Sequence, residues 1–197
     1  MQQLKLSVMF SAVHTDLLPR WLADSRMCSL RVSFNEAGNE KLLAAGGLEP
    51  LWAAAERYQI PVAVFRREGA APFESVVQRH PDLTVIIDHL NWAKPEVRAR
   101  KLDELDSLAR YPNVYVKVSA LPLQSSEPPP YGDLRPVIRR VHASYGAQRL
   151  MWGSDQTQVI ARNRGSYREN ADIIRVLAAK DLPAADVESM LHGTAAK

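Results

Sequence analysis

The sequence predicts an α/β fold of the (β/α)8 TIM-barrel type that is incomplete, with about six of the eight βα units present. Short runs of β-branched and apolar residues alternate with segments of helical period, which is typical of parallel strands buried on both faces. Polar, reactive residues close several of these runs, as they do at the catalytic rim of a barrel. The glycine-rich turns that would favour an open doubly wound sheet do not occur.

The sequence contains six candidate strands. Each is a run of five to seven residues, rich in valine, isoleucine, leucine or phenylalanine and bounded by polar residues or turn formers. They are Leu4–Phe10, Ser29–Phe34, Pro61–Phe65, Thr84–Asp88, Asn113–Val118 and Arg149–Gly153. A typical barrel has eight strands in about 250 residues. We therefore expect this chain of 197 residues to be two strands short at its amino end.

Helices are expected between these strands. Apolar residues recur at helical spacing from Leu48 to Tyr58 and from Leu134 to Tyr145, so each segment predicts a helix that lays one stripe on the sheet. A last helix is expected near the carboxyl terminus. Asp181 is its predicted cap, Pro183 lies in its predicted first turn, and Gly193 is its predicted stop.

The composition fits one globular domain, which we expect to span residues 1–197. The single cysteine, Cys28, cannot form an internal disulfide, so a cytoplasmic location is the default expectation. No apolar run is long enough to cross a membrane, so no membrane is expected as a partner. The arginines are scattered in pairs instead of forming a basic stripe, so no nucleic acid is expected either.

Side chains of several chemical kinds close the candidate strands. The fourth run is followed by His89, and the sixth is followed by a single carboxylate, Asp155. Lys117 and Ser119 close the fifth run. Because side chains alternate between the two faces of a strand, we expect only one of these two to face the barrel interior. The cationic candidates near the ends of the second and third runs are Arg31 and Arg66.

Four phrases of the sequence, taken together, are similar to the amidohydrolase-related family of TIM-barrel hydrolases. They occur in the order and spacing of that family from about residue 29 to the carboxyl terminus, and they are LTVIIDHLNWAKP, PNVYVKVSAL, QRLMWGSDQT and LHGTAAK. The resemblance is closest to the branch of sugar lactonases and 2-pyrone-4,6-dicarboxylate lactonases. It implies a (β/α)8 barrel that hydrolyses a lactone, an amide or a related ester, or decarboxylates an aromatic acid.

The resemblance also implies roles for two residues. His89, in the DH phrase, would polarise the substrate carbonyl, either directly or through a divalent metal. Asp155, in the GSD phrase, would be the general base that activates water. A lactone hydrolase also needs groups that hold its substrate. The residues that could bind substrate carboxylates or hydroxyls are Arg31, Arg66, Lys117 and Ser119.

Each of these residues also has a plainer interpretation. Asp155 could cap a turn, and His89 could be a core histidine bonded to a backbone carbonyl. The arginines could lie in ordinary ion pairs, for which the neighbouring acids are Glu36 and Glu68. The resemblance favours the functional interpretation for Asp155 and His89 and leaves both interpretations open for the arginines.

The sequence departs from the family pattern at the expected metal ligands. Family members begin with an H-x-H pair, which does not occur in this sequence, and Phe65 stands near a position where metal-dependent relatives carry histidine. A stable zinc site usually takes three or four protein ligands. We therefore expect one divalent metal, zinc or manganese, to be held weakly by His89 and Asp155, or not at all.

We favour a hydrolase that opens a lactone or similar cyclic ester, with a small molecule as its substrate. One alternative is a metal-dependent decarboxylase of an aromatic acid, which would need more histidines than the five present. Another is a truncated, catalytically silent barrel fragment that only binds a ligand or partner. A chain that begins at the third barrel strand would expose two sheet edges, from Leu4 to Phe10 and from Arg149 to Gly153. Such edges favour pairing with a second copy, and hence a homo-oligomer.

Overall fold

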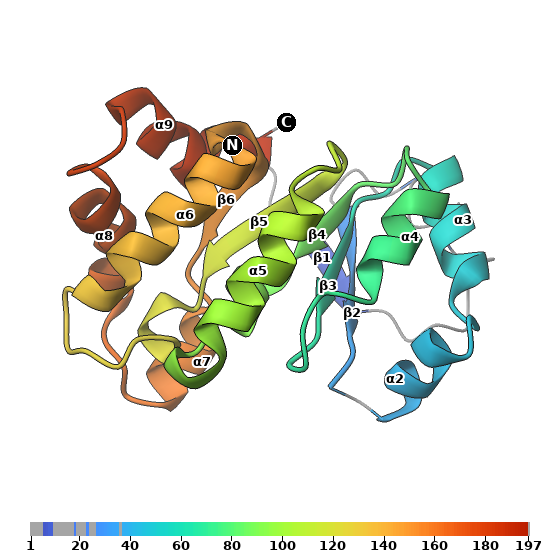
Figure 1. Cartoon of the computed structure of the whole chain (residues 1–197), viewed down its shortest axis with the longest axis horizontal. Helices are drawn as coiled ribbons and strands as arrows, with labels where there is room; N and C mark the ends of the chain where they lie inside the picture. Colours follow the sequence, from blue (N-terminus) through green and yellow to red (C-terminus); the bar gives the residue numbers. More distant parts are fainter. Residues whose placement is uncertain (1–5, 10–17, 19–22, 24–26, 36, 197) are drawn as a thin grey trace. The chain divides into compact units, whose positions relative to one another are not determined.

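The computed structural model describes residues 6–9, 18, 23, 27–35 and 37–196 of the chain (Figure 1). The chain divides into two compact units. The first unit contains Met1–Ile87 and Tyr111–Val114, and the second contains Asp88–Arg110 and Tyr115–Lys197. The expectation of one domain spanning residues 1–197 stays a prediction. Within the described ranges, no helix has the length and the apolar character that crossing a bilayer requires.

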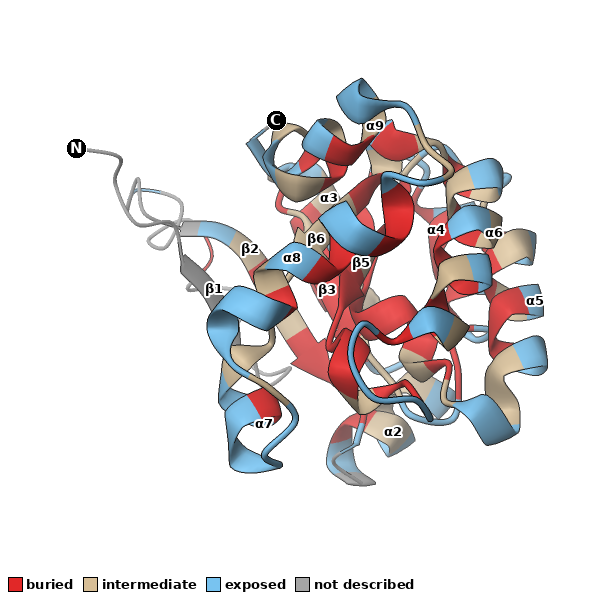
Figure 2. Ribbon diagram, turned by 90° about the vertical axis from the view of Figure 1, so that its left-hand side faces the viewer, coloured by how far each residue is buried: buried red, intermediate tan, exposed pale blue. Residues whose placement is uncertain are grey.

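Parallel strands form the sheet of the first unit. They are β1 (Leu6–Met9), β2 (Met27–Ser33), β3 (Val62–Phe65) and β4 (Val85–Ile87). Leu30 lies beside Val62, and Val62 lies beside Val85. All three side chains are buried, as expected of parallel strands that are covered on both faces (Figure 2).

Helices follow β2 and β3 in this unit, and they are α2 (Ala37–Ala44), α3 (Glu49–Arg57) and α4 (Phe73–Arg79). The predicted helix from Leu48 to Tyr58 is confirmed as α3, which buries the apolar stripe of Leu51, Trp52 and Ala55. The ring of Phe73 meets the ring of Phe34 edge to face, with 5.2 Å between the centroids. This contact packs the start of α4 against the end of β2.

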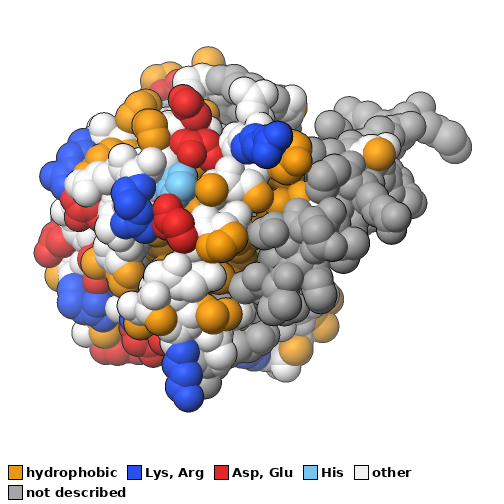
Figure 3. Space-filling view, turned by 90° about the vertical axis from the view of Figure 1, so that its right-hand side faces the viewer, with side chains coloured by type: hydrophobic (Ala, Val, Ile, Leu, Met, Phe, Trp, Pro, Cys, Tyr) orange, Lys and Arg blue, Asp and Glu red, His pale blue; other side chains and the backbone are white. Residues whose placement is uncertain are grey.

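A buried histidine ties α3 to the end of α4. His80 Nδ1 lies 2.8 Å from Glu56 Oε2, and His80 Nε2 lies 2.9 Å from Glu49 Oε1. Both ring nitrogens therefore lie within hydrogen-bonding distance of a carboxylate, one near each end of α3. The hydrogen bond from His80 lowers the pKa of Glu56, against the raising effect of burial. Figure 3 shows the face of the first unit that carries these helices.

This cluster predicts a pH-dependent loss of stability. We expect Glu56→Gln to lower the free energy of unfolding by about 1 kcal/mol at pH 7. Because the folded-state pKa of Glu56 lies below its ordinary value of 4.5, the wild type gains this stability above that pH and loses it as pH falls further. Urea unfolding at pH 7 and pH 3 would measure the difference, with Glu96→Gln as a control at an exposed position. A deficit of equal size at both pH values would contradict the account.

The second unit contains β6 (Leu150–Gly153) and β5 (Val114–Ser119), except for Val114, which belongs to the first unit. The two strands pair in parallel. Its α-helices among the described residues are α5 (Arg98–Leu108), α6 (Arg135–Tyr145), α7 (Gln156–Ala161), α8 (Tyr167–Ala178) and α9 (Ala184–Glu188). The predicted helix from Leu134 to Tyr145 is confirmed as α6. At the start of α8, Ser166 and Glu169 form a reciprocal capping box that fixes where the helix begins.

All six predicted strands are present. The largest shift in a described boundary is two residues, where β2 begins at Met27 instead of Ser29; Leu4 and Phe10 lie outside the described residues. The prediction for the last helix was wrong in its start. Pro183 is the N-cap of α9, and Asp181 instead accepts two hydrogen bonds from the Arg135 guanidinium.

Candidate active site

A left-handed turn places His89 directly after β4. His89, Leu90, Asn91 and Trp92 all have positive φ angles, between 49° and 58°. A left-handed conformation costs a residue other than glycine about 1–2 kcal/mol. Four such residues in a row persist only where the surrounding structure holds them, and such strain is concentrated at functional sites. This turn also explains why β4 ends at Ile87 and not at Asp88, as the sequence had predicted.

Helix α5 holds the left-handed turn in place. The side-chain amide of Asn91 donates to the backbone carbonyl of Lys101 at 3.0 Å and to Glu104 Oε2 at 2.9 Å. Asn91 and Leu90 are both buried. Asparagine tolerates the left-handed region better than most residues, so Asn91 both accepts the conformation and fastens it.

Ser119, at the end of β5, orients the imidazole of His89. Ser119 Oγ lies 2.8 Å from His89 Nδ1, and both side chains are buried. If the hydroxyl donates, Nδ1 is the acceptor and Nε2 carries the proton, so Nε2 can donate to a carbonyl oxygen. If Nδ1 donates instead, Nε2 carries a lone pair, which is the form that binds a metal. The core-histidine interpretation predicted a backbone carbonyl as partner, whereas this partner is a side-chain hydroxyl.

Lys117 and Asp88 form an ion pair beside this histidine. Lys117 Nζ lies 2.9 Å from Asp88 Oδ1, with 26% of the lysine side chain and 1% of the aspartate side chain exposed. The expectation that only one of Lys117 and Ser119 would face the interior was wrong. They are two positions apart on β5, and alternation places positions i and i+2 on the same face. Both therefore contact the Asp88-His89 pair.

Asp155 ends the short loop between β6 and α7. It has a φ of 49° and occupies the N-cap position of α7, but its side chain makes no capping hydrogen bond. Asp155 therefore occupies the position of a helix cap, but capping does not explain why a carboxylate stands there. Behind it, the buried amide of Asn170 in α8 donates to the Ser154 carbonyl at 2.5 Å and fixes this loop.

Gly153 lets β6 approach Ser119 closely. Gly153 and Ser119 are neighbours in the β5–β6 register, and a Cβ built on Gly153 would lie 3.3 Å from Ser119 Cβ. That separation is tighter than an ordinary van der Waals contact. The glycine of the GSD phrase therefore leaves room for the serine that orients His89, and it brings the start of the Asp155 loop next to that serine.

We expect Gly153→Ala to impair activity more than stability. The added methyl group would push Ser119 and disturb its hydrogen bond to His89, which we expect to lower kcat/KM about tenfold. Steady-state kinetics together with thermal melting would separate the two effects. Gly38→Ala is a matched control, because a Cβ there would meet nothing within 4 Å. Unchanged kinetics in Gly153→Ala would contradict this role.

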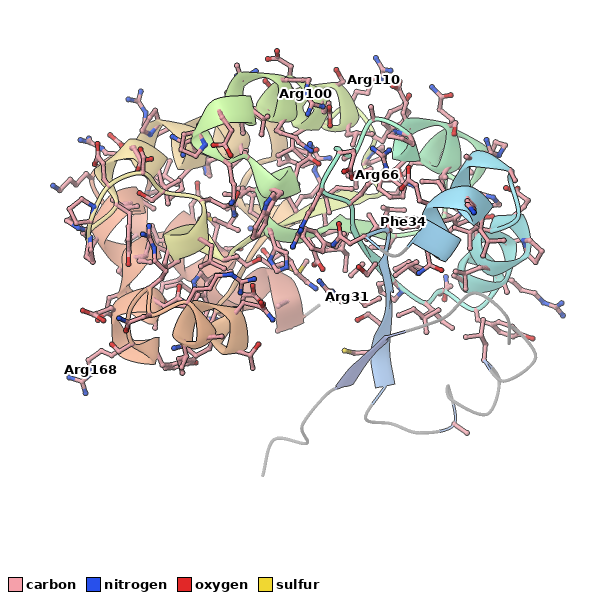
Figure 4. All side chains as sticks on the ribbon, turned by 90° about the horizontal axis from the view of Figure 1, so that it is seen from below. Arg31, Phe34, Arg66, Arg100, Arg110 and Arg168 are labelled. Carbon is pink, nitrogen blue, oxygen red and sulfur yellow. The ribbon has the colours of Figure 1, made fainter. Side chains whose placement is uncertain are left out.

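The two arginines nominated for substrate binding belong to the first unit (Figure 4). Arg66 holds Glu40 of α2 through two nitrogens, with Nη2 2.6 Å from Oε1, and it donates to the Gly69 carbonyl. The Arg31 guanidinium lies 5.7 Å from the centre of the Phe65 ring. Their roles in binding substrate stay predictions. Glu40 was missed from the sequence because it is 26 residues from Arg66.

Comparisons with known proteins show what this chain is similar to. The family model described as Amidohydrolase matches residues 12–197. A curated L-fucono-1,5-lactonase from Burkholderia ambifaria is 35% identical over 82 residues, which cover 40% of this chain and 28% of that protein. The match therefore spans less than a third of that relative's length.

Solved structures show the fold. An amidohydrolase from Burkholderia multivorans, solved with bound zinc, has a TM-score of 0.80 at 22% identity, over 96% of this chain and 71% of that one. A putative 2-pyrone-4,6-dicarboxylic acid hydrolase from Pseudomonas putida has a TM-score of 0.75 at 23% identity, over 95% and 69%. A TIM-barrel protein from Bordetella bronchiseptica has a TM-score of 0.60 at 18% identity, over 96% and 63%. The predicted fold class, the TIM-barrel type, is confirmed.

The zinc in the Burkholderia multivorans structure raises the question of a metal in this chain. Among the described residues, no group of three or more histidine, cysteine, aspartate or glutamate side chains is arranged to hold one. His89 and Asp155 could each supply one ligand, while His14 lies outside the described residues. Two ligands do not make up a stable zinc site, so the described residues do not fit a complete one.

We accordingly expect weak retention of metal. After dialysis against a chelator, elemental analysis should find zinc and manganese well below one equivalent per chain, because two protein ligands hold a divalent cation poorly. The same measurement on His89→Asn would serve as the baseline. One full equivalent that survives dialysis in the wild type and is lost in the variant would contradict this expectation.

Proposed function

Because the chain belongs to the amidohydrolase family, we propose that it is a hydrolase that opens a lactone or a similar cyclic ester. The observation that carries this proposal is the fixed imidazole of His89, held by Ser119 on β5 while Asp155 follows the neighbouring strand β6. One group can donate to a carbonyl and the other can accept a proton from water. These are the two functions that ester hydrolysis needs.

The proposed reaction adds water to the lactone carbonyl. The Asp155 carboxylate takes a proton as the water oxygen bonds to the carbonyl carbon, and Nε2–H of His89 donates to the oxyanion that forms. The bond between that carbon and the ring oxygen then breaks. The proton returns from Asp155 to the departing alkoxide, which gives a hydroxy acid and restores the carboxylate. This step uses the tautomer in which the Ser119 hydroxyl donates to Nδ1 and Nε2 carries the proton.

The experiment that tests this function is a lactone panel. The purified protein would be assayed with L-fucono-1,5-lactone and D-galactono-1,5-lactone in a pH-indicator assay, after subtraction of spontaneous hydrolysis. We expect turnover above the spontaneous rate with at least one of them. Release of carbon dioxide from an aromatic acid without lactone turnover would favour the decarboxylase, and neither activity would favour a chain that only binds ligands.

The substrate, on this account, is a small molecule that carries a lactone ring. The L-fucono-1,5-lactonase relative supports a sugar lactone, and the 2-pyrone-4,6-dicarboxylic acid hydrolases support a cyclic ester in general. We also propose a cytoplasmic location, on the basis of a single cysteine, Cys28. A homo-oligomer stays a prediction, which light scattering in solution would test.

A further inference from the structure

The Asp88–Lys117 ion pair lies next to His89 and Ser119, which are joined by a hydrogen bond. Asp88 directly precedes His89, and Lys117 is two positions before Ser119 on the same face of β5. The aspartate side chain is 1% exposed and the lysine side chain 26% exposed. The carboxylate is therefore closed off from solvent, while part of the lysine side chain is exposed.

The charges of this pair cancel each other. The contact between Lys117 and Asp88 is an ion pair, and an ammonium group has three N–H donors with which it can also bind a substrate oxygen. A substrate carboxylate would compete with Asp88 for the same positive charge and would lie near a buried negative one. A substrate hydroxyl would gain a hydrogen bond and add no charge. The pair thus distinguishes substrates by repulsion as well as by attraction.

We propose that Asp88 and Lys117 form a specificity-determining pair that selects uncharged, hydroxyl-bearing lactones over lactones that carry a carboxylate. The proposal rests on the proposed lactone hydrolysis.

A matched pair of substrates tests the proposal. D-galactono-1,5-lactone and D-galactaro-1,5-lactone differ only in a hydroxymethyl group that is a carboxylate in the second. We expect the wild type to have the higher kcat/KM for the uncharged lactone. Asp88→Asn should shift the ratio of the two values about tenfold toward the charged lactone, because it leaves Lys117 unbalanced. Lys117→Gln should shift it about tenfold in the opposite direction, because it removes the positive charge of the pair and keeps the negative one.

Opposite shifts distinguish charge selection from structural damage. A variant that is only damaged loses activity on both lactones alike and leaves their ratio unchanged. The double variant Asp88→Asn/Lys117→Gln restores a neutral pair, so its ratio should return to within about threefold of the wild type. Asp103→Asn is the matched control, because it removes a carboxylate from an ion pair with Arg140 at a position that is 70% exposed. Its ratio should equal that of the wild type.

Some variants could turn over too slowly for kinetics. For these, calorimetry would measure the dissociation constants of the ring-opened products, galactonate and galactarate. The ratio of these two constants replaces the ratio of the kcat/KM values, because galactarate carries one more carboxylate than galactonate. Single variants with unchanged ratios, or ratios that shift in the same direction, would overturn the proposal. Absence of turnover of both lactones and of L-fucono-1,5-lactone by the wild type would overturn the proposed function itself. Turnover with unchanged ratios would overturn only the selectivity of the pair.

Discussion

We expect Asp155→Asn to lose lactone hydrolysis by about a hundredfold or more while it stays folded. The amide has nearly the shape of the carboxylate, but it cannot accept the proton that the attacking water must lose. The loss should appear in kcat and kcat/KM together, because proton transfer contributes to the transition state and not to substrate binding. Steady-state kinetics and a thermal melt of the same preparation would measure both properties.

A matched control for this variant lies in α8. Asp172→Asn makes the same change at a side chain that is 54% exposed and pairs only loosely, at 3.7 Å, with Arg175. It should retain wild-type kinetics. A loss of less than about tenfold in Asp155→Asn, which corresponds to about 1.4 kcal/mol of barrier, would show that Asp155 is not the base.

The second large effect is expected at His89. We expect His89→Asn to lower kcat about a hundredfold, because a buried donor aimed at the oxyanion contributes most in the transition state. Asparagine is the suitable replacement, since it accepts the left-handed backbone that His89 adopts at φ 53°. The loss of kcat would then result from the missing imidazole and not from disruption of the left-handed turn.

Ser119→Ala separates orientation from chemistry at the same position. It keeps the imidazole but removes the hydrogen bond to Nδ1, so we expect a smaller loss, about tenfold, and a changed pH profile. If Ser119→Ala were as damaging as His89→Asn, the serine would take part in the reaction itself. If His89→Asn kept wild-type kinetics, the role of His89 at the carbonyl would be wrong.

The strands were predictable because their signal is local. Runs such as those at Val62–Phe65 and Leu150–Gly153 are recognisable from a few neighbouring residues, and every described boundary lies within two residues of its prediction. The left-handed turn after β4 was not predictable in this way. It contains no glycine, and the enrichment of histidine and asparagine at positive φ is too weak to predict four such residues in a row.

The site was predictable as a list of residues but not as a set of contacts. The ends of β4, β5 and β6 supplied His89, Ser119 and Asp155 from sequence alone. The partners of charged groups were missed, because Lys117 and Asp88 are joined only when the chain folds. The expectation that only one of Lys117 and Ser119 faces the interior was wrong, since strand alternation places residues two positions apart on the same face. Gly153 could have been singled out from its place in the GSD phrase.

The central claim is that Asp155 and His89 act on the same carbonyl in one reaction. The double variant Asp155→Asn/His89→Asn tests it most directly, through kcat/KM for the best lactone of the panel. Residues that act as a unit are strongly non-additive. The account predicts that the double variant is within about threefold of the worse single variant. If the fold-loss in kcat/KM of the double variant equals the product of the two single fold-losses, the claim would be contradicted.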